Sequence, residues 1–511
     1  MRNRLVLVLI ITLWVMPCKG QNYFNERNTV HSLFSKFSSV VQLNGKYYCV
    51  GTCVDSLRFV VFDQFGNIEV DTNYLTPNKS INIWGNNLNI TKDSCLVLAV
   101  TEPDTGYINM AVIMKFDRKG HLLLEREYEV PFCASLYQVF DLKPTGTGEW
   151  LMLANQECRT AISNNYAVTK LDSNFNVIWN KQLIITPAND VPSRILVENN
   201  GYLFAGTNVD GSYLGPTYTY RAALIKTDTA GNVLWNWRRD TTRQINAIQD
   251  VIKTKDSGYV YCSTICYEHS LDISGHSPQH WKGWIEKLDR NRNVVWSDSI
   301  GFYYGDHSLT NQTALKELNN GDIVVAGAVD GGLDSNTTTL PNYSNYATLI
   351  CYSANGIRKW SRHYQLPNDS LYYSVYDMKQ TTDKGYVLVG DALGNKKPYY
   401  QSWIIKVDSN GCSSPTDPQC RPLSTKNWQL AYAYINVYPN PAHDIVNVRT
   451  MELQNAEVII TDMAGRICIQ QAFSNDKNMQ SIRITSLPSG MYFYKIMQVG
   501  IAIGIGKFVK Q

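Results

Sequence analysis

Carboxylate side chains recur at one place in a pattern that fills most of this chain, and carboxylates can act as general acids or bases. Each copy starts with Asp, or once with Ser, and Gly follows three residues later in five of the seven copies. Such a side chain accepts hydrogen bonds from later backbone N–H groups, and Gly tolerates positive φ, so the spacing is typical of a tight turn. Because active sites are rarely repeated sevenfold, we interpret these residues as structural. The seven positions are Asp63, Asp117, Asp172, Asp228, Asp289, Ser353 and Asp408.

Metal ligands are the second kind of chemistry that the residue types allow. His269, His276 and His280 share one loop, and zinc or another transition metal could use such imidazoles. Their spacing fits neither a helix nor a strand, so we prefer to interpret the segment as an ordinary surface loop. Calcium could bind at Asp/Asn-rich turns such as residues 330–334, although that composition is unspecific.

Other catalytic patterns are missing from the sequence. It contains no Gly-x-Ser-x-Gly elbow, no His-Glu-x-x-His and no Gly-rich loop that could hold a phosphate. The net charge of +3 is small for 511 residues, which argues against nucleic acid as a partner. We therefore predict no catalytic residue and no resident cofactor, and the protein is not expected to be an enzyme.

The cysteines indicate one disulfide. Cys412 and Cys420 bracket a short Ser/Pro/Asp-rich loop and are the pair that we expect to be bonded. Loss of residues 1–20 would leave eleven of the twelve cysteines, an odd number, so at least one is unpaired or pairs between chains. No paired Cys-x-x-Cys spacing is present, so a structural zinc site is not expected.

The anchor positions identify the elements that carry all these residues. They are separated by 54, 55, 56, 61, 64 and 55 residues, and a period of this kind indicates a repeat architecture. Seven residues after the anchor, one position holds a large ring in four copies, which suggests packing between neighbouring units. In the remaining copies Val70, Leu124 and Pro415 stand at this position. The rings are Trp179, Trp235, Trp296 and Trp360.

Each repeat also contains short apolar strands. Runs such as residues 201–206, 258–263 and 385–390 are apolar on both faces and should be buried on both faces. Each unit then holds about four strands, and no stretch shows convincing helical periodicity. Seven such units predict an all-β fold, a seven-bladed β-propeller, followed by a small immunoglobulin-like β-sandwich. The seventh unit lacks a last strand, which residues 23–34 could supply.

The two ends of the chain have compositions of their own. Residues 1–20 form a basic head and a short apolar run, which predict a cleaved signal peptide. A lipoprotein acylated at Cys18 is the alternative, and Pro17 fits it poorly. No other stretch is long and apolar enough to span a membrane. We assign residues 21–420 to the propeller, 421–434 to a linker and 435–511 to the sandwich.

Two family resemblances follow from these residues. Residues 225–235 have the form Lys-x-Asp-x-x-Gly-Asn-x-x-Trp, and residues 40–412 resemble propellers of exported Bacteroidetes proteins. The C-terminal segment closely resembles the type A sorting domain of the type IX (Por) secretion system. That resemblance implies a Gram-negative bacterium, with the translocon and a sortase-like peptidase as partners and secretion or display at the cell surface. The motif residues are Tyr438, Pro439, Asn440, Pro441, Asp462, Gly465, Arg466, Pro488, Gly490, Tyr492 and Lys507.

The loops give the best clue to the work of the propeller. Units four to seven carry long insertions between their second and third strands, at residues 208–220, 268–281, 329–346 and 392–401. They are rich in Tyr, Gly, Asn, Ser and Thr, a composition that suits carbohydrate or protein recognition. The preferred hypothesis is a binding or adhesion module at the cell surface. The alternatives are a hydrolase or lyase of glycans or peptides at the tunnel mouth, and a structural envelope protein.

Overall fold

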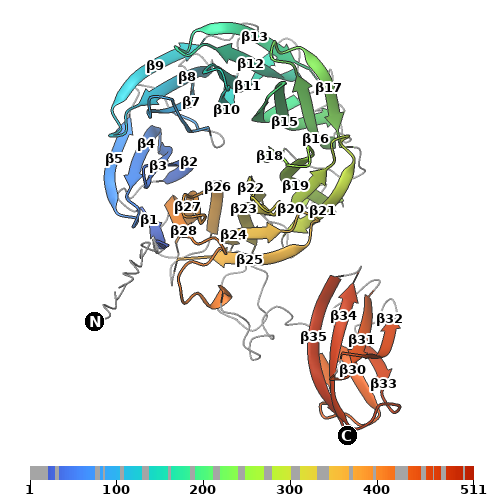
Figure 1. Ribbon diagram of the computed structural model, residues 1–511. Helices are drawn as coiled ribbons and strands as arrows, with labels where there is room; N and C mark the ends of the chain where they lie inside the picture. Colours follow the sequence, from blue (N-terminus) through green and yellow to red (C-terminus); the bar gives the residue numbers. More distant parts are fainter. Residues whose placement is uncertain are drawn as a thin grey trace, which may run out of the picture. The chain divides into compact units, whose positions relative to one another are not determined.

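A computed structural model divides the chain into two compact units, residues 1–419 and 420–511. Figure 1 shows the strands of both units. The predicted signal peptide lies outside the residues that the structure describes. Those residues are 21–28, 34–74, 81–83, 87–103, 109–128, 137–158, 163–184, 190–210, 219–239, 248–269, 279–300, 311–330, 345–366, 372–394, 399–420, 436–449, 456–463, 465–472, 479–498 and 501–511.

The first unit is a ring of seven four-stranded antiparallel sheets, which confirms the predicted seven-bladed propeller. Blades 1 to 3 contain β2 (Ser35–Leu43), β3 (Lys46–Cys53), β4 (Ser56–Phe62), β5 (Ile68–Tyr74); β6 (Asn89–Ile90), β7 (Leu96–Pro103), β8 (Asn109–Phe116), β9 (Leu122–Tyr128); β10 (Tyr137–Pro144), β11 (Trp150–Cys158), β12 (Ser163–Leu171) and β13 (Val177–Leu183). Blades 4 to 6 contain β14 (Asp190–Glu198), β15 (Gly201–Asp210), β16 (Thr219–Thr227), β17 (Val233–Arg238); β18 (Asp250–Lys253), β19 (Tyr259–His269), β20 (Gln279–Leu288), β21 (Val294–Ile300); β22 (Asn311–Glu317), β23 (Ile323–Asp330), β24 (Asn345–Tyr352) and β25 (Arg358–Tyr364). Blade 7 contains β26 (Tyr372–Gln380), β27 (Tyr386–Leu393), β28 (Gln401–Val407) and β1 (Phe24–Arg27).

The order of strands within a blade runs outward from the ring axis. In Figure 1 the first strands, such as β10, β18 and β26, surround the centre, and β9, β13 and β17 lie on the rim. The second and third strands are almost entirely buried because they pack against neighbouring blades on both faces, as their apolar sequences predict. The hydrophobic clusters accordingly join residues of successive blades.

The two ends of the propeller sequence meet in blade 7. Strand β1 pairs antiparallel with β28, with Phe24 opposite Lys406 and Arg27 opposite Trp403. The indole of Trp403 donates a hydrogen bond of 2.7 Å to the side chain of Asn25. This confirms that the N-terminal segment completes the last blade, and it removes the open sheet edge that an unclosed ring would expose.

The repeated aspartates form the turns that follow the third strands of their blades. In blade 3, Asp172 Oδ1 accepts the backbone N–H groups of Asn174 and Asn176, and Asp172 Oδ2 accepts the Asn176 amide, each at 2.8 Å. The hydrogen bond from the Asn176 side chain is the first reason that the pKa of Asp172 is low. Phe175 and Arg292 take the place of the turn glycine and still adopt positive φ, 64° and 68°.

The recurring tryptophan position packs one blade onto the turn of the next. The rings of Trp179, Trp296 and Trp360 lie directly against Gly231, Gly356 and Gly411, where a Cβ would collide with them. Trp235 lies below Arg292 instead, with the guanidinium 4.5 Å from the ring centre. The predicted packing between neighbouring units is therefore confirmed.

One residue at this position was predicted wrongly. Pro415 does not replace the ring in blade 7, because the fourth strand of that blade is β1. Phe24 pairs with Lys406 just as Trp179 pairs with Lys170, and its ring lies against Gly66 of blade 1. The tryptophan position of blade 7 therefore contains an aromatic side chain, supplied from the other end of the sequence.

The second unit is a two-sheet all-β domain, as predicted. Its sheets contain β29 (Asn436–Tyr438), β30 (Ile445–Arg449) and β33 (Met479–Arg483), and β31 (Ala456–Thr461), β32 (Ile467–Ala472), β34 (Gly490–Gln498) and β35 (Ile501–Lys510). A core that includes Val446, Val458, Ile482 and Ile496 lies between them. The described part of the chain contains one short 3-10 helix, η1 (Pro418–Cys420). No helix among the described residues is long and apolar enough to cross a membrane.

The described cysteines fall into two groups. Cys412 and Cys420 are both disulfide-bonded. Cys49 and Cys262 are free thiols on the second strands of blades 1 and 5, where they are fully buried and pack as small apolar side chains. Burial raises the pKa of both thiols, so they are unreactive in the folded protein.

Candidate functional site

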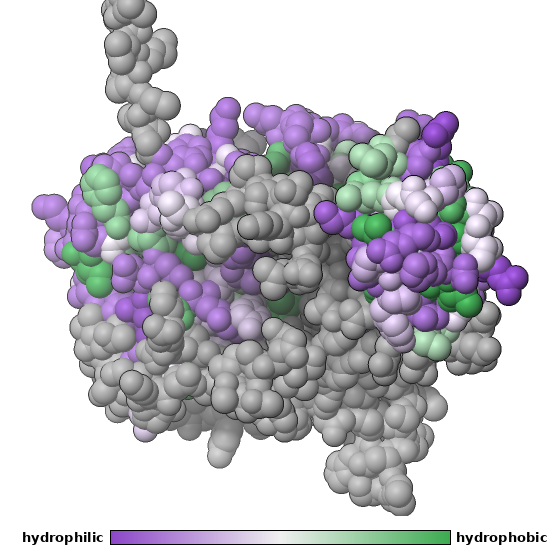
Figure 2. Space-filling view, turned by 90° about the horizontal axis from the view of Figure 1, so that it is seen from below, coloured by the Kyte–Doolittle hydropathy of each residue, from purple (hydrophilic) through white to green (hydrophobic). Residues whose placement is uncertain are grey.

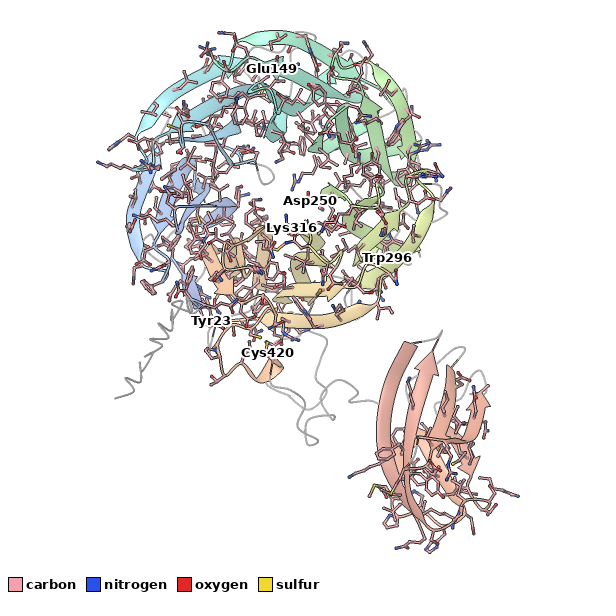
Figure 3. All side chains as sticks on the ribbon, in the orientation of Figure 1. Tyr23, Glu149, Asp250, Trp296, Lys316 and Cys420 are labelled. Carbon is pink, nitrogen blue, oxygen red and sulfur yellow. The ribbon has the colours of Figure 1, made fainter. Side chains whose placement is uncertain are left out.

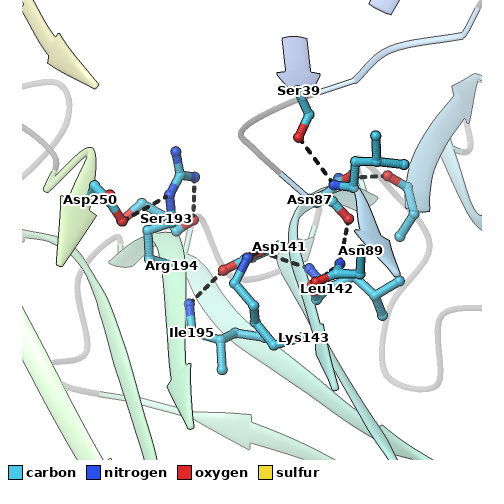
Figure 4. A network of polar contacts seen from close by, with 12 residues as sticks. Ser39, Asn87, Asn89, Asp141, Leu142, Lys143, Ser193, Arg194, Ile195 and Asp250 are labelled. Carbon is cyan, nitrogen blue, oxygen red and sulfur yellow. Dashed lines mark hydrogen bonds and ion pairs between the residues drawn. The ribbon is translucent and has the colours of Figure 1, made fainter. Parts of the chain in front are cut away.

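The inner strands of the propeller share a bulge that turns one side chain toward the following blade. The register shifts by one residue just before Ser39, Asp141, Arg194, Ala314 and Asp377. Figure 4 shows several of these residues around the centre of the ring. We call this place the ring position. Asn87 and Asp250 hold the same place in blades 2 and 5, as the hydrogen bonds across the seams show. The residue after Asn87, Leu88, donates its N–H to Ser39 of blade 1, and Asp250 accepts the N–H of the residue after Ala314.

Three aspartates at the ring position fasten adjacent blades together. Asp141 Oδ2 accepts the N–H of Ile195 in blade 4 at 2.8 Å, and Oδ1 accepts its own neighbour Leu142 at 2.9 Å. Asp250 Oδ2 accepts the N–H of Leu315 in blade 6 at 2.8 Å. Buried N–H groups of two blades are thus satisfied by one carboxylate, which couples the blades.

The third aspartate closes the ring. Asp377 Oδ2 accepts the N–H of Val40 at 3.0 Å and the hydroxyl of Ser39 at 3.1 Å, both in blade 1. Asp377 Oδ1 accepts the N–H of Met378 at 2.8 Å. Ser39 Oγ in turn accepts the N–H of Leu88 in blade 2 at 3.3 Å. A chain of hydrogen bonds therefore passes across the seam that joins the two ends of the sequence.

Cations accompany each of these aspartates. Lys143 Nζ lies 2.7 Å from Asp141 Oδ1, and Lys379 Nζ lies 2.7 Å from Asp377 Oδ1. Arg194 Nε lies 3.7 Å from Asp250 Oδ1 (Figure 4). Three cations thus pair with three carboxylates around the ring axis, and their charges balance. We call the space along this axis the channel.

Lys316 breaks this balance. It stands two residues after the ring position of blade 6, as Lys143 and Lys379 do in blades 3 and 7. That ring position is Ala314, which carries no charge. Lys316 is exposed, and none of the ion pairs among the described residues includes it. Figure 3 shows Lys316 and Asp250 near the centre of the ring.

A cleft of about 320 Å³ opens at this point between blades 5, 6 and 7. Its walls include two cations, the hydroxyl residues of the turn after β26, and one carboxylate. Burial raises the pKa of that carboxylate, Asp250, and Arg194 opposes the shift. The lining residues are Asp250, Leu315, Lys316, Met378, Lys379, Gln380, Thr381 and Thr382.

The other predicted site residues are only partly described. His269 and His280 lie at the facing ends of β19 and β20, but their side chains, and all of His276, lie outside the described residues. The calcium turn continues from Asp330 into residues 331–334, which also lie outside. So do the central parts of the four long loops. Metal binding and loop recognition therefore stay predictions.

One further group of possible metal ligands is present in blade 2. Ligand oxygens of Glu102, Glu125 and Glu127 all lie within 4.8 Å of one another. Glu102 is buried, whereas the other two are exposed on β9. The sequence analysis did not name this group, since Glu102 is separated from the others by a whole strand.

The motif residues of the C-terminal unit occupy structural places. Asp462 forms the same kind of turn as the propeller aspartates, and its Oδ2 lies 2.7 Å from Nε of Arg466. Tyr492 is buried, stacks on Phe508 and donates a hydrogen bond of 2.9 Å to the Pro488 carbonyl. The backbone N–H of Val509 donates to Asn440 Oδ1 at 2.9 Å, which ties the Pro-Asn-Pro segment to the last strand.

Sequence reasoning missed the residues of the channel. Asp141 precedes its blade's glycine, Gly148, by seven residues, and Asp377 and Asp250 precede Gly385 and Gly258 by eight. An alignment of the repeats on these glycines would have shown the aspartates at one place. The pattern is hard to see in sequence because Ser, Asn, Arg and Ala fill the same place in the other blades.

The structure thus defines the class of protein: a closed seven-bladed β-propeller with an all-β C-terminal unit. Residues 436–511 match the family described as "Secretion system C-terminal sorting domain". This confirms the sorting domain of the type IX secretion system, and the protein is secreted or displayed at the cell surface.

Comparisons of the whole chain give distant matches. No curated protein matches its sequence. Drosophila Semaphorin 2a is similar at 9% identity, covering 96% of this chain and 97% of its own, with a TM-score of 0.44. An α-L-arabinofuranosidase from Fusarium graminearum is similar at 11% identity over 66% and 96%, with a TM-score of 0.42. A protein of unknown function from Bacteroides caccae is similar at 14% identity over 52% and 82%, with a TM-score of 0.32. Values this low say nothing about the activity of this chain.

Proposed function

We propose that this secreted propeller is a binding module of the cell surface that receives its ligand at the mouth of the central channel. The observation that carries the proposal is that carboxylates of the channel hold the blades together and are not accessible to a ligand. The carboxylates of Asp141 and Asp377 are fully buried and are occupied by backbone N–H groups and lysines. A general acid or base must exchange a proton with the substrate, and these two carboxylates have no surface for contact with it.

On the face in Figure 2, hydrophilic residues predominate among those that are coloured, and the apolar ones lie in separate spots. Isolated apolar residues of this kind are normal on a protein surface. The concave cleft in the channel is the place where we propose that specific binding occurs.

The test uses the mature chain, residues 21–511. Immobilised glycans and surface proteins are screened for binding of the purified protein, and we expect saturable binding that excess soluble ligand reverses. Absence of binding to every glycan and protein class would contradict the proposal. A structural envelope protein would give that negative result and would instead remain in the insoluble envelope fraction.

A glycan-cleaving enzyme is the second candidate, and one observation favours it. Asp250 lines the cleft, is only 15% exposed, and has its pKa raised by burial. A carboxyl group of that kind can donate a proton. The release of new sugar ends from a bound glycan, and its loss in Asp250→Asn, would establish an enzyme. Binding without product would favour the binding module.

A further inference from the structure

The charges around the channel cleft indicate what kind of ligand it accepts. At the ring position each carboxylate has a cation beside it, so Asp141, Asp250 and Asp377 neutralise Lys143, Arg194 and Lys379. Lys316 lies in the same cleft without such a partner among the described residues. The cleft therefore has one surplus positive charge, and that charge is exposed.

Lys379 can assist Lys316. Its ammonium group has three N–H donors, of which the described contacts use one, toward Asp377 at 2.7 Å. Its side chain is 34% exposed, so it can still reach a ligand. The hydroxyl of Thr382 and the amide of Gln380 add polar groups beside the two lysines. Two ammonium groups and neutral polar side chains in one concave space suit an anionic group on a polyhydroxylated molecule.

The residue at the ring position of blade 6 explains why Lys316 is not neutralised as Lys143 and Lys379 are. At the ring position of blade 6, Ala314 provides no side chain that could reach across to blade 7. Asp250 and Asp141 fill that space at the seams of blades 5 and 3, where they bind the next blade. Ala314 is itself buried and belongs to one core cluster with Met378 of blade 7, so no carboxylate at the ring position of blade 6 pairs with Lys316.

We infer that the channel cleft binds an acidic polysaccharide, and that Lys316, assisted by Lys379, receives a carboxylate or sulfate group of one sugar unit. This inference rests on the proposed binding function and names its ligand class. A cleft of about 320 Å³ lies at the lower end of the range for small-ligand sites, which suits one sugar unit rather than a folded protein surface.

The experiment measures binding of the mature protein to three soluble polymers by biolayer interferometry. Polygalacturonate carries carboxylates, dextran sulfate carries sulfates, and dextran is neutral. We expect one or both of the acidic polymers to bind and dextran not to bind. The variant Lys316→Gln should weaken the binding at least about tenfold, since a charge-assisted contact contributes about 1.5–3 kcal/mol. Preference between the two acidic polymers identifies the anionic group.

A matched control separates the cleft from general surface charge. Lys119 is an exposed lysine in the turn after β8, so Lys119→Gln removes the same charge outside the cleft. It should leave the binding unchanged. Equal binding of dextran, equal losses in the two variants, or no binding of either acidic polymer would overturn the inference. If other ligands still bind and Lys316→Gln has no effect on them, the proposed binding function stands without it.

Discussion

Asp391 gives the sharpest test of the energetics of this propeller. It lies near the end of the second strand of blade 7 and is almost fully buried, and its carboxylate accepts a hydrogen bond of 3.1 Å from Tyr376. Burial raises its pKa from 3.8 to about 6. Lys36 lies nearby, and its charge only partly offsets the burial. The folded protein therefore favours the protonated form of Asp391.

The sign of the pH dependence follows from this shift. A group with a raised pKa stabilises the folded state fully below the pKa of the unfolded chain, and this stability is lost as the pH rises through about 6. A shift of about two pKa units corresponds to about 3 kcal/mol in total. About 1.4 kcal/mol of it should disappear between about pH 5 and pH 8.

The perturbation is Asp391→Asn, which keeps the shape of the side chain and removes its titration. The free energy of unfolding of the wild type, relative to that of the variant, should fall by about 1.4 kcal/mol from about pH 5 to pH 8. The assay is urea unfolding followed by tryptophan fluorescence. Residues 436–511 contain no Trp, so the signal reports on the rest of the chain.

A control and a refuting result complete the test. Asp63 has a low pKa because its carboxylate accepts hydrogen bonds in an exposed turn, so Asp63→Asn should change stability equally at both pH values. A difference between wild type and Asp391→Asn that stays constant over this pH range, or that grows as the pH rises, would refute the assignment of a raised pKa to Asp391.

Three further predictions concern the closure of the ring and the disulfide. Phe24→Ala should lower the free energy of unfolding by about 3 kcal/mol, because a packed ring is lost. Phe65→Ala, which removes an exposed ring in the turn that Phe24 contacts, should have little effect. Equal melting temperatures of the two variants would contradict this prediction. Asp377→Ala should lower the free energy of unfolding by about 3 kcal/mol or more, since it leaves buried N–H groups of blades 7 and 1 without an acceptor. Asp289→Ala, in an exposed turn, should lower it by less in the same urea titration. Digestion without reduction, followed by mass spectrometry, should give one peptide pair that joins Cys412 to Cys420, and any other partner for either cysteine would disprove the predicted pairing.

The repeat was predictable from sequence because its structural residues keep the same type in most copies. Aspartate is nearly invariant at the turn since two backbone N–H groups need one acceptor there, and Gly or a tolerated substitute must adopt positive φ. The C-terminal unit was predictable for a different reason, because its motif residues resemble a known family.

The channel could not be predicted in this way. The acceptor for the N–H of the next blade can be an Asp carboxylate or, in blade 1, the hydroxyl of Ser39. The residue type therefore varies while the geometry stays constant. The ring at the closing seam was also missed. Phe24 completes a blade that begins 348 residues later at Tyr372, and the periodicity of a linear sequence does not show which distant segment supplies the strand.

These two failures have one physical origin, and it bears on function. In a closed ring the buried backbone N–H groups at each seam need an acceptor, but side chains of different types can provide it, so the inner residues differ from blade to blade. Variation there changes the charge of the side chains around the ring axis. In blade 6 the buried methyl group of Ala314 replaces a bridging carboxylate, and Lys316, two residues later, lines the cleft with an exposed ammonium group. A repeat protein of this kind can therefore acquire a binding site where the inner residues of one seam differ from those of its neighbours, while the repeated turns and rings maintain the fold around it.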